Sequence, residues 1–257
     1  MSGEEMAPAI PAATLVLMRE RLAAPPELLM LERAGTMAFA AGAMVFPGGR
    51  IDPGDLALAT NEAVIGALPP KDAAARIAAI RETIEEVGIA IGLHPLPDAA
   101  AIAALRQALA EGADFGALLA AGGWALRLEE LTAFARWRPN FRETRLFDTN
   151  FYLAFTPEGI EPAADGGESV HALWISAQDA LAGADEGRYR VIFPTRRNLE
   201  RLALFAGFEE ARAHASTFAI EPVTPWIEER AGEKFLCIRD DQGYPVTAVP
   251  LADQLRI

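Results

Sequence analysis

Three glutamates at spacings of three and four residues mark the segment Arg81–Gly88, which reads Arg-Glu-Thr-Ile-Glu-Glu-Val-Gly. At about 100° of rotation per helical residue, Glu82, Glu85 and Glu86 lie within an arc of about 100° on one helix face. The opposite face is an aliphatic stripe made of Ile77, Ile80, Ile84 and Val87. Packing of that stripe would hold the helix rigidly, while the three acids are crowded together at an electrostatic cost.

A divalent cation would offset that cost. Arg81 can pair with Glu85 at i,i+4, but one guanidinium does not neutralise three carboxylates. Mg²⁺ and Mn²⁺ prefer oxygen ligands and are commonly held by carboxylates together with substrate phosphates. Three scattered histidines and the single Cys237 exclude a Cys/His zinc cage. The alternative interpretation is a solvated acidic helix face.

The surrounding sequence indicates elements that would position this helix. Residues 71–87 are rich in alanine, with Asp72 as the expected cap and Gly88 at the stop position. Upstream, the apolar run 41–46 predicts a strand that leads into a tight loop at Pro47-Gly48-Gly49. Residues 14–18 and 27–31 predict a β-hairpin, with its turn at Ala23-Ala24-Pro25-Pro26.

The remaining chain predicts one domain, residues 1–257, with its core at about 14–205. Residues 98–134 predict two or three helices that form an insertion. Residues 147–155 and 170–175 predict strands. Ser176 and Thr195 are expected helix caps, and residues 218–257 predict an appended β-hairpin.

Composition narrows the classes of partner. The chain has 257 residues, 51% of them hydrophobic, and a formal net charge of −13. Such a charge argues against nucleic acid and anionic membranes as partners, since both need a basic surface. An acidic N-terminal segment and the absence of an apolar run of about 18 residues predict a cytoplasmic protein. Small molecules remain as ligands.

The helix and the glycine loop together resemble the Nudix hydrolase family, whose box reads G-x5-E-x7-R-E-U-x-E-E-x-G-U, where U is a bulky aliphatic residue. Gly49, Arg81-Glu82, Glu85-Glu86 and Gly88-Ile89 match it. Thr83 replaces an aliphatic residue, Asp55 stands where the first glutamate is expected, and 25 residues rather than seven separate Asp55 from Arg81. The resemblance implies an α/β fold: an α/β/α sandwich around a mixed β-sheet.

The long insert is similar to the branch of CoA and acyl-CoA diphosphatases. Its signature agrees at Leu29, Arg33, Ala34, Gly42 and the run Phe46–Gly49, and differs at Met30, Leu31 and Ala38. The resemblance implies hydrolysis of a diphosphate linkage, with CoA or acyl-CoA as the leading substrate. ADP-ribose, an NDP-sugar or a dinucleoside polyphosphate are alternative substrates, and a non-catalytic ligand sensor is an alternative function.

The resemblance also implies roles for individual residues. Glu82, Glu85 and Glu86 would hold Mg²⁺ or Mn²⁺ and carry the catalysis with Arg81, one glutamate doubling as a general base that spacing does not identify. Glu168 is the candidate for a further metal-binding and catalytic acid, with Glu143 as the alternative. The expected substrate-binding residues are Arg33, Gly48, Gly49, Arg142 and Arg145.

Several of these residues have plainer alternatives. Arg142 and Arg145 belong to an arginine group with Arg127, Arg136 and Arg138, which either binds phosphate or pairs with surface acids. Trp137, Phe141 and Phe151 either stack on an adenine or belong to the core, the more frequent place for aromatic residues. A homodimer is an alternative to a monomer.

Overall fold

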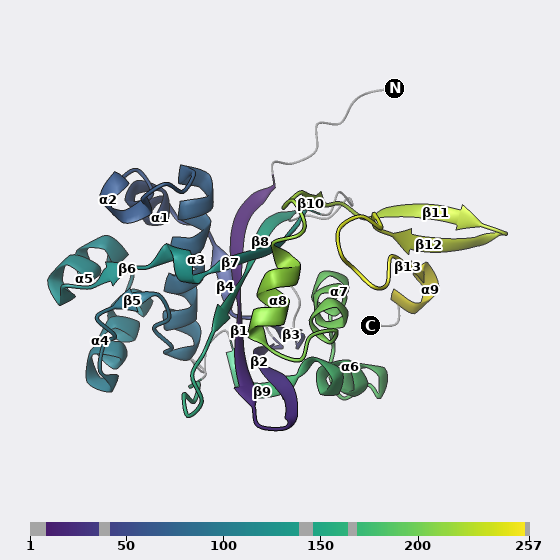
Figure 1. The fold of residues 1–257 in the computed structure, drawn as a ribbon, viewed down its shortest axis with the longest axis horizontal. Helices are drawn as coiled ribbons and strands as arrows, with labels where there is room; N and C mark the ends of the chain where they lie inside the picture. The colour runs from purple at the N-terminus through teal and green to yellow at the C-terminus, as the bar shows by residue number, and fades with distance from the viewer. Residues whose placement is uncertain (1–8, 36–41, 139–145, 164–168, 255–257) are drawn as a thin grey trace.

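A mixed β-sheet between two groups of helices forms the centre of the molecule (Figure 1). The computed structural model describes residues 9–35, 42–138, 146–163 and 169–254. Within these ranges, eight strands form the main sheet in the order β10-β7-β8-β1-β2-β3, with β4 paired to β1 and β9 paired to β2. The pairs β1·β8 and β7·β10 are parallel and the others are antiparallel. The predicted α/β class and mixed sheet are confirmed.

The strands β1 (Ile10–Arg21) and β2 (Ala24–Arg33) form the predicted hairpin. Alternate residues point to opposite faces, so Leu15 and Leu17 enter one core while Val16 and Met18 enter the other. The predicted turn is misplaced: Arg21 pairs with Ala24, so Leu22 and Ala23 form the turn. Pro25 and Pro26, expected in the turn, lie in β2.

The other strands of the main sheet are β3 (Met44–Val45), β4 (Gly48–Arg50), β7 (Thr132–Trp137), β8 (Phe147–Phe155), β9 (Ser169–Ser176) and β10 (Pro222–Val223). The strand predictions at 147–155 and 170–175 are confirmed. The predicted tight loop at Gly48-Gly49 is wrong, because both glycines belong to β4 and pair with Thr14 and Ala13 of β1.

One face of the sheet is covered by the helix that carries the glutamates and by the helices around it (Figure 1). These are α1 (Pro53–Leu58), α2 (Glu62–Ile65), α3 (Pro70–Val87), α4 (Ala99–Ala110) and α5 (Phe115–Gly122), with the short strands β5 (Leu93–His94) and β6 (Ala125–Leu126) and a 3₁₀ turn, η1 (Leu128–Glu130). The insertion predicted at 98–134 contains the helices α4 and α5, but its last residues, 132–134, begin β7 of the main sheet.

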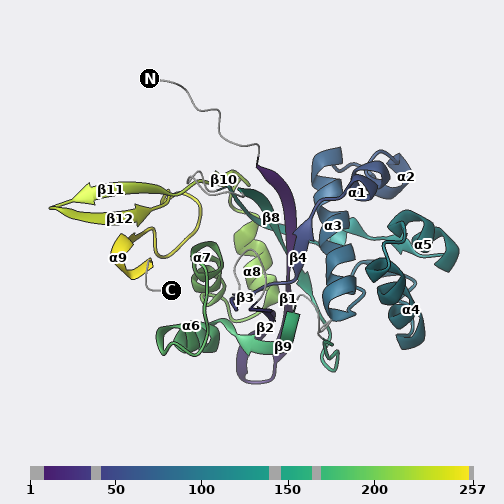
Figure 2. The same ribbon diagram turned by 180° about the vertical axis from the view of Figure 1, so that it is seen from behind.

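The opposite face is covered by α6 (Ala177–Asp185), α7 (Phe193–Leu202) and α8 (Phe208–Ala215), as Figure 2 shows from behind. Ser176 caps α6 as predicted. Thr195 was expected to cap a helix but lies within α7, whose N-cap is Ile192. The C-terminal segment projects from this side as the predicted hairpin, β11 (Trp226–Arg230) with β12 (Glu233–Cys237), joined by β13 (Ala248–Pro250) and followed by α9 (Leu251–Gln254).

Two apolar cores result, one on each face of the sheet. Trp137 and Phe151 belong to the core beneath α6, α7 and α8. The indole N–H of Trp137 donates a hydrogen bond to the hydroxyl of Tyr244 at 2.9 Å. Both aromatic residues therefore have structural roles, and stacking on an adenine is excluded for them. No helix in the described part of the chain is both long enough and apolar enough to cross a membrane.

Candidate active site

The helix α3 is longer than predicted by one residue and ends as predicted. Gly88 follows its last residue with φ of 67°, in the left-handed region that favours glycine. Asp72 is not the cap, because the helix begins at Pro70 and its N-cap is Pro69. The carboxylate of Asp72 instead accepts hydrogen bonds from Arg76, at 2.8 Å, and from the hydroxyl of Tyr152, at 2.7 Å.

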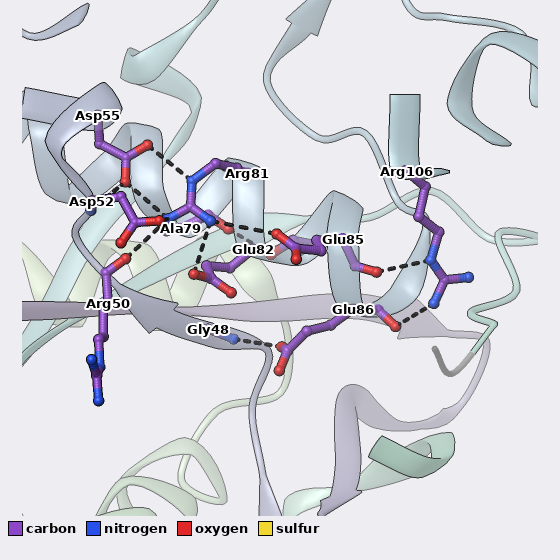
Figure 3. Close-up of polar contacts among 11 residues, drawn as sticks. Gly48, Arg50, Asp52, Asp55, Ala79, Arg81, Glu82, Glu85, Glu86 and Arg106 are labelled. Carbon is purple, nitrogen blue, oxygen red and sulfur yellow. Dashed lines mark hydrogen bonds and ion pairs between the residues drawn. The ribbon is translucent and has the colours of Figure 1, made fainter. Parts of the chain in front are cut away.

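Both faces of α3 are covered. The aliphatic stripe packs on the sheet as predicted, with Ile77 and Ile84 fully buried. The acidic face is not a solvated surface, since Glu86 is buried and the side chain of Glu82 is only 17% exposed. The glutamates on this face lie beside β4 (Figure 3). Burying carboxylates in this way requires specific partners.

The two glycines of β4 provide the first of these partners. The backbone N–H of Gly48 donates a hydrogen bond of 2.8 Å to Oε2 of Glu86. A Cβ atom at Gly49 would overlap the carboxylate of Glu82, and one at Gly48 would overlap the carbonyl of Ala13. A side chain at Gly48 would therefore disturb the pairing of β4 with β1, and one at Gly49 would displace the carboxylate of Glu82 on α3. The structure therefore brings Gly48 and Gly49 to the predicted glutamates.

Arg81 is the second partner and the centre of the cluster. Its guanidinium donates to Oε1 of Glu82 at 2.9 Å and to the backbone carbonyl of Arg50 at 3.0 Å. It also forms an ion pair with Glu85 at 3.5 Å, the i,i+4 pair expected from the sequence. Arg81 thus positions two of the three glutamates and ties them to the end of β4 (Figure 3).

Asp55 is the most buried carboxylate of the site, at 1% exposed, and its role was missed by the sequence analysis. Its two oxygens accept hydrogen bonds from Nε and Nη2 of Arg81, at 3.0 and 2.9 Å. The backbone N–H of Asp52 donates to the same carboxylate at 2.8 Å. The run Asp52-Pro53-Gly54-Asp55 resembles a helix N-terminus with an acid at its third position, and this signal could have located it.

The C-terminal end of α3 is held by α4. Arg106 donates hydrogen bonds from Nε to the carbonyl of Glu85, at 2.8 Å, and from Nη2 to the carbonyl of Glu86, at 2.7 Å. Carbonyls in the last turn of a helix have no intrahelical partner, and a cation placed there interacts favourably with the helix dipole. The helical insertion thereby fixes the backbone that carries two of the glutamates.

The electrostatics of the cluster are visible in Glu82. Burial raises the pKa of its carboxyl to about 7, and the nearby charge of Glu85 acts in the same direction, whereas Arg81 lowers it. Burial alone would lower the pKa of Arg81, but its hydrogen bond to Asp55 and the charges of Glu82 and Asp55 outweigh burial and raise it. Burial thus disfavours the charged form of Glu82, whereas Arg81 stays charged.

The donor set fits a hard cation, since Glu82, Glu85 and Glu86 offer only carboxylate oxygens on one helix face. In the described part of the chain, no three carboxylate, histidine or cysteine side chains form a ready-made metal site. The carboxylates of Glu82 and Glu86 are directed to Arg81 and Gly48. The metal-binding role of the three glutamates stays a prediction.

The other predicted residues are less informative. Arg33 lies at the end of β2, where its N–H donates to the carbonyl of Ala43 at 3.0 Å. Arg136 forms a two-point pair with Asp148, at 2.7 Å each, which favours the surface-pair alternative for this arginine. Five of the residues named in the sequence analysis lie outside the described ranges: Phe141, Arg142, Glu143, Arg145 and Glu168.

Comparison with known proteins identifies the family. No family model matches the chain. A Nudix hydrolase from Alicyclobacillus acidocaldarius, known from its crystal structure, is 32% identical and superposes with a TM-score of 0.72, covering 85% of this chain and 100% of that one. This chain belongs to the Nudix hydrolase family. A curated relative, the acyl-coenzyme A diphosphatase NUDT19 of Gallus gallus, is 25% identical over 78% of this chain and 67% of its own length.

The departures from the Nudix box have physical explanations. Thr83 occupies an aliphatic position that is fully buried, and its hydroxyl donates to the carbonyl of Ala79 at 2.7 Å, so no polar atom is left unsatisfied. Asp55 holds Arg81 in place. The inserted residues between Asp55 and Arg81 form the end of α1, the helix α2 and the first turns of α3.

Removal of Arg81 should be strongly destabilising. Arg81→Ala leaves the carboxylate of Asp55 buried without its two-point partner, which costs about 3–5 kcal/mol. In chemical denaturation, the double variant Arg81→Ala with Asp55→Ala should lose less than the sum of the two single variants, because the two side chains interact directly. Arg212→Ala, which breaks the exposed pair with Glu209, is the control and should cost about 1 kcal/mol or less. If the losses of unfolding free energy in the two single variants added up to that of the double variant, Arg81 and Asp55 would not be coupled.

Gly49→Ala should lower the free energy of unfolding by about 1–3 kcal/mol, the usual cost of overpacking, because the new methyl group meets the carboxylate of Glu82. Gly35→Ala is the matched control, since a Cβ atom there has no neighbour within 4 Å. Thermal and urea unfolding of the two variants measure the difference. Equal stability of both would show that β4 does not press on α3.

The raised pKa of Glu82 predicts a pH-dependent stability of the metal-free protein. The folded chain holds this proton up to about pH 7, whereas the ordinary value is 4.5. Folded protein then binds more protons than unfolded chain between these values, so this side chain lowers stability as the pH rises from about 4.5 to about 7. Urea denaturation in EDTA should show Glu82→Gln gaining stability relative to the parent over that interval. A pH-independent difference would contradict the shift.

Proposed function

We propose that this protein is a divalent-metal-dependent diphosphatase and that CoA or acyl-CoA is its substrate. The observation that carries the proposal is the cluster of three glutamates on the helix of a Nudix hydrolase, in which Arg81 holds Glu82 and Glu85 and the N–H of Gly48 holds Glu86. A solvated acidic face would need neither the clamp nor the glycines. A non-catalytic sensor would have no need of all three glutamates.

Different residues would bind the metal, position its ligands and bind the substrate. Glu82, Glu85 and Glu86, together with Glu168, would hold Mg²⁺ or Mn²⁺. A cation held there supplies charge neutralisation for diphosphate oxygens and an acidified water. Arg81 keeps two glutamates in place, and one glutamate accepts the proton of the attacking water. Gly48 and Gly49 lie against the carboxylates, and Arg33, Arg142 and Arg145 would bind the phosphates of the substrate.

The choice of CoA or acyl-CoA rests on similarity. The relative NUDT19 is named as an acyl-coenzyme A diphosphatase, and this chain shares Leu29, Arg33, Gly42 and the run Phe46–Gly49 with the signature of that branch. ADP-ribose, NDP-sugars and dinucleoside polyphosphates are the competing substrates. The net charge of −13 supports a small ligand in each case.

Product analysis decides among these substrates. The protein is incubated with CoA, octanoyl-CoA, ADP-ribose, an NDP-sugar or a dinucleoside polyphosphate in Mg²⁺ or Mn²⁺, and products are separated chromatographically. We expect 3′,5′-ADP from the CoA substrates, with a higher kcat/KM than for the others, and no turnover in EDTA. Preferred release of AMP from ADP-ribose would replace the proposed substrate. Absence of turnover with every substrate and both metals would support a sensor.

Glu85→Gln and Glu86→Gln should each lower kcat on the best substrate by about a hundredfold or more, the scale expected for loss of a key charged group. Glutamine keeps a hydrogen-bond acceptor for Gly48 or Arg81, so folding should survive, and a thermal melt checks this. Glu229→Gln, an exposed acid on β11 of the C-terminal hairpin, should keep the parent rate. Full activity of both site variants at saturating metal would overturn the assignment.

A further inference from the structure

A groove of about 560 Å³ adjoins the C-terminal end of α3. One wall is α4, with Ala99, Ile102 and Ala103, and the floor is the end of α3 with Val87 and Gly88. The opposite wall is the segment before β9, with Glu161 and Ala163. The volume lies within the range of small-molecule sites, about 300–1,000 Å³.

The groove is continuous with the candidate active site. Glu85 lines the groove and also belongs to the carboxylate cluster through its ion pair with Arg81, at 3.5 Å. Its side chain is 35% exposed, compared with 17% for Glu82 and 1% for Asp55, which also pair with Arg81. The groove therefore begins at a residue of the carboxylate cluster, where a substrate whose diphosphate lies at the glutamates would place one of its ends.

Charge decides which end of a substrate the groove would accept. Glu85 and Glu161 place two carboxylates at its edge, each paired with an arginine outside the lining, Arg81 at 3.5 Å and Arg19 at 3.1 Å. Arg106 is the one lining cation among the described residues. Two nitrogens of Arg106 already donate to the carbonyls of Glu85 and Glu86. A further phosphate would therefore meet two carboxylates here and one arginine that already donates to backbone carbonyls. Most of the other lining side chains are alanine or branched aliphatic, which favours an uncharged, largely apolar group.

Hydrogen bonds hold both walls of the groove. The N–H of Ala163 donates to the carbonyl of Val87 at 3.1 Å, and the indole of Trp174 donates to the carbonyl of Ile160 at 3.1 Å. Arg106 fixes α4 to the end of α3. Binding therefore requires little ordering of the protein, which favours affinity.

We propose that this groove binds the uncharged arm of the substrate, an acyl-pantetheine chain attached to one side of the diphosphate. This inference rests on the proposed function, and it assigns a binding site to the acyl-pantetheine half of the proposed substrate. The acyl end packs against Ile102, Ala103 and Ala163. Two nitrogens of Arg106 and the amide nitrogen of Gln107 are already hydrogen-bonded, so Nη1 of Arg106 would donate to carbonyl groups of the arm and Oε1 of Gln107 would accept from its amides. The helical insertion would then be a specificity element as well as a support for α3.

A series of saturated acyl-CoA substrates of increasing chain length tests the groove. In the parent protein kcat/KM should rise with chain length by up to about fourfold per methylene until the groove is filled, as expected for burial of each group. Ala103→Trp should flatten this dependence, reducing the ratio of kcat/KM for decanoyl-CoA to that for acetyl-CoA at least tenfold, since the indole occupies the groove.

Ala104→Trp is the matched control. Ala104 is an exposed neighbour on the same helix that does not line the groove, so this variant should keep both the rate and the chain-length dependence of the parent. No chain-length dependence in the parent, an unchanged dependence in Ala103→Trp, or equal flattening by Ala104→Trp would overturn the proposal.

A binding measurement separates this proposal from the proposed function. S-octanoyl-pantetheine carries no phosphate and needs no metal, so we expect it to shift the methyl NMR signals of Val87, Ile102 and Ala163 in EDTA, and not in Ala103→Trp. Shifts without hydrolysis of any diphosphate would overturn the proposed function and keep the groove. Hydrolysis of acyl-CoA without these shifts, at probe concentrations well above the KM for octanoyl-CoA, would overturn the groove alone.

Discussion

The guanidinium of Arg81 is the interaction on which the candidate site depends. Four carboxylates lie within ion-pair distance of it: Asp55 and Glu82 at 2.9 Å, Glu85 at 3.5 Å and Asp52 at 3.6 Å. One positive charge cannot balance four, and Glu82, whose pKa is raised mainly by burial and further by the charge of Glu85, is the carboxyl least easily ionised. Arg81 therefore lowers the cost of burying the carboxylates without neutralising all of them. A bound cation would balance the negative charge that remains.

The fold converts this local balance into a fixed arrangement. Packing of the aliphatic stripe sets the position of α3 against the sheet. The absence of a side chain at Gly48 lets β4 pair with β1, and its absence at Gly49 leaves room for the carboxylate of Glu82. Asp55 reaches Arg81 only because α1 follows β4 directly and packs against α3. Arg106 secures the other end of the helix. Strand, inserted helices and central helix thus each constrain the same few carboxylates.

The sequence predicted the parts of this arrangement that depend on local pattern. The end of α3 at Gly88, the strand Phe147–Phe155 and the cap Ser176 follow from neighbouring residues alone. The errors concern contacts between distant segments. Gly48 and Gly49 resemble a loop until β1 pairs with them, and Pro25 and Pro26 resemble a turn until β2 forms. The partner of Asp55 lies 26 residues away, which no local rule supplies.

The helical insertion joins recognition to chemistry through a single residue. Arg106 binds the carbonyls of Glu85 and Glu86 while its side chain lines the groove beside them. The groove residues of α4 other than Arg106 are mostly alanines, whose replacement changes the shape of the cavity without changing the charge near the glutamates. Under the proposed function, chemistry depends on charge at α3 and fit depends on volume at α4, so substitutions at α4 would change the preferred substrate while the carboxylate cluster is kept.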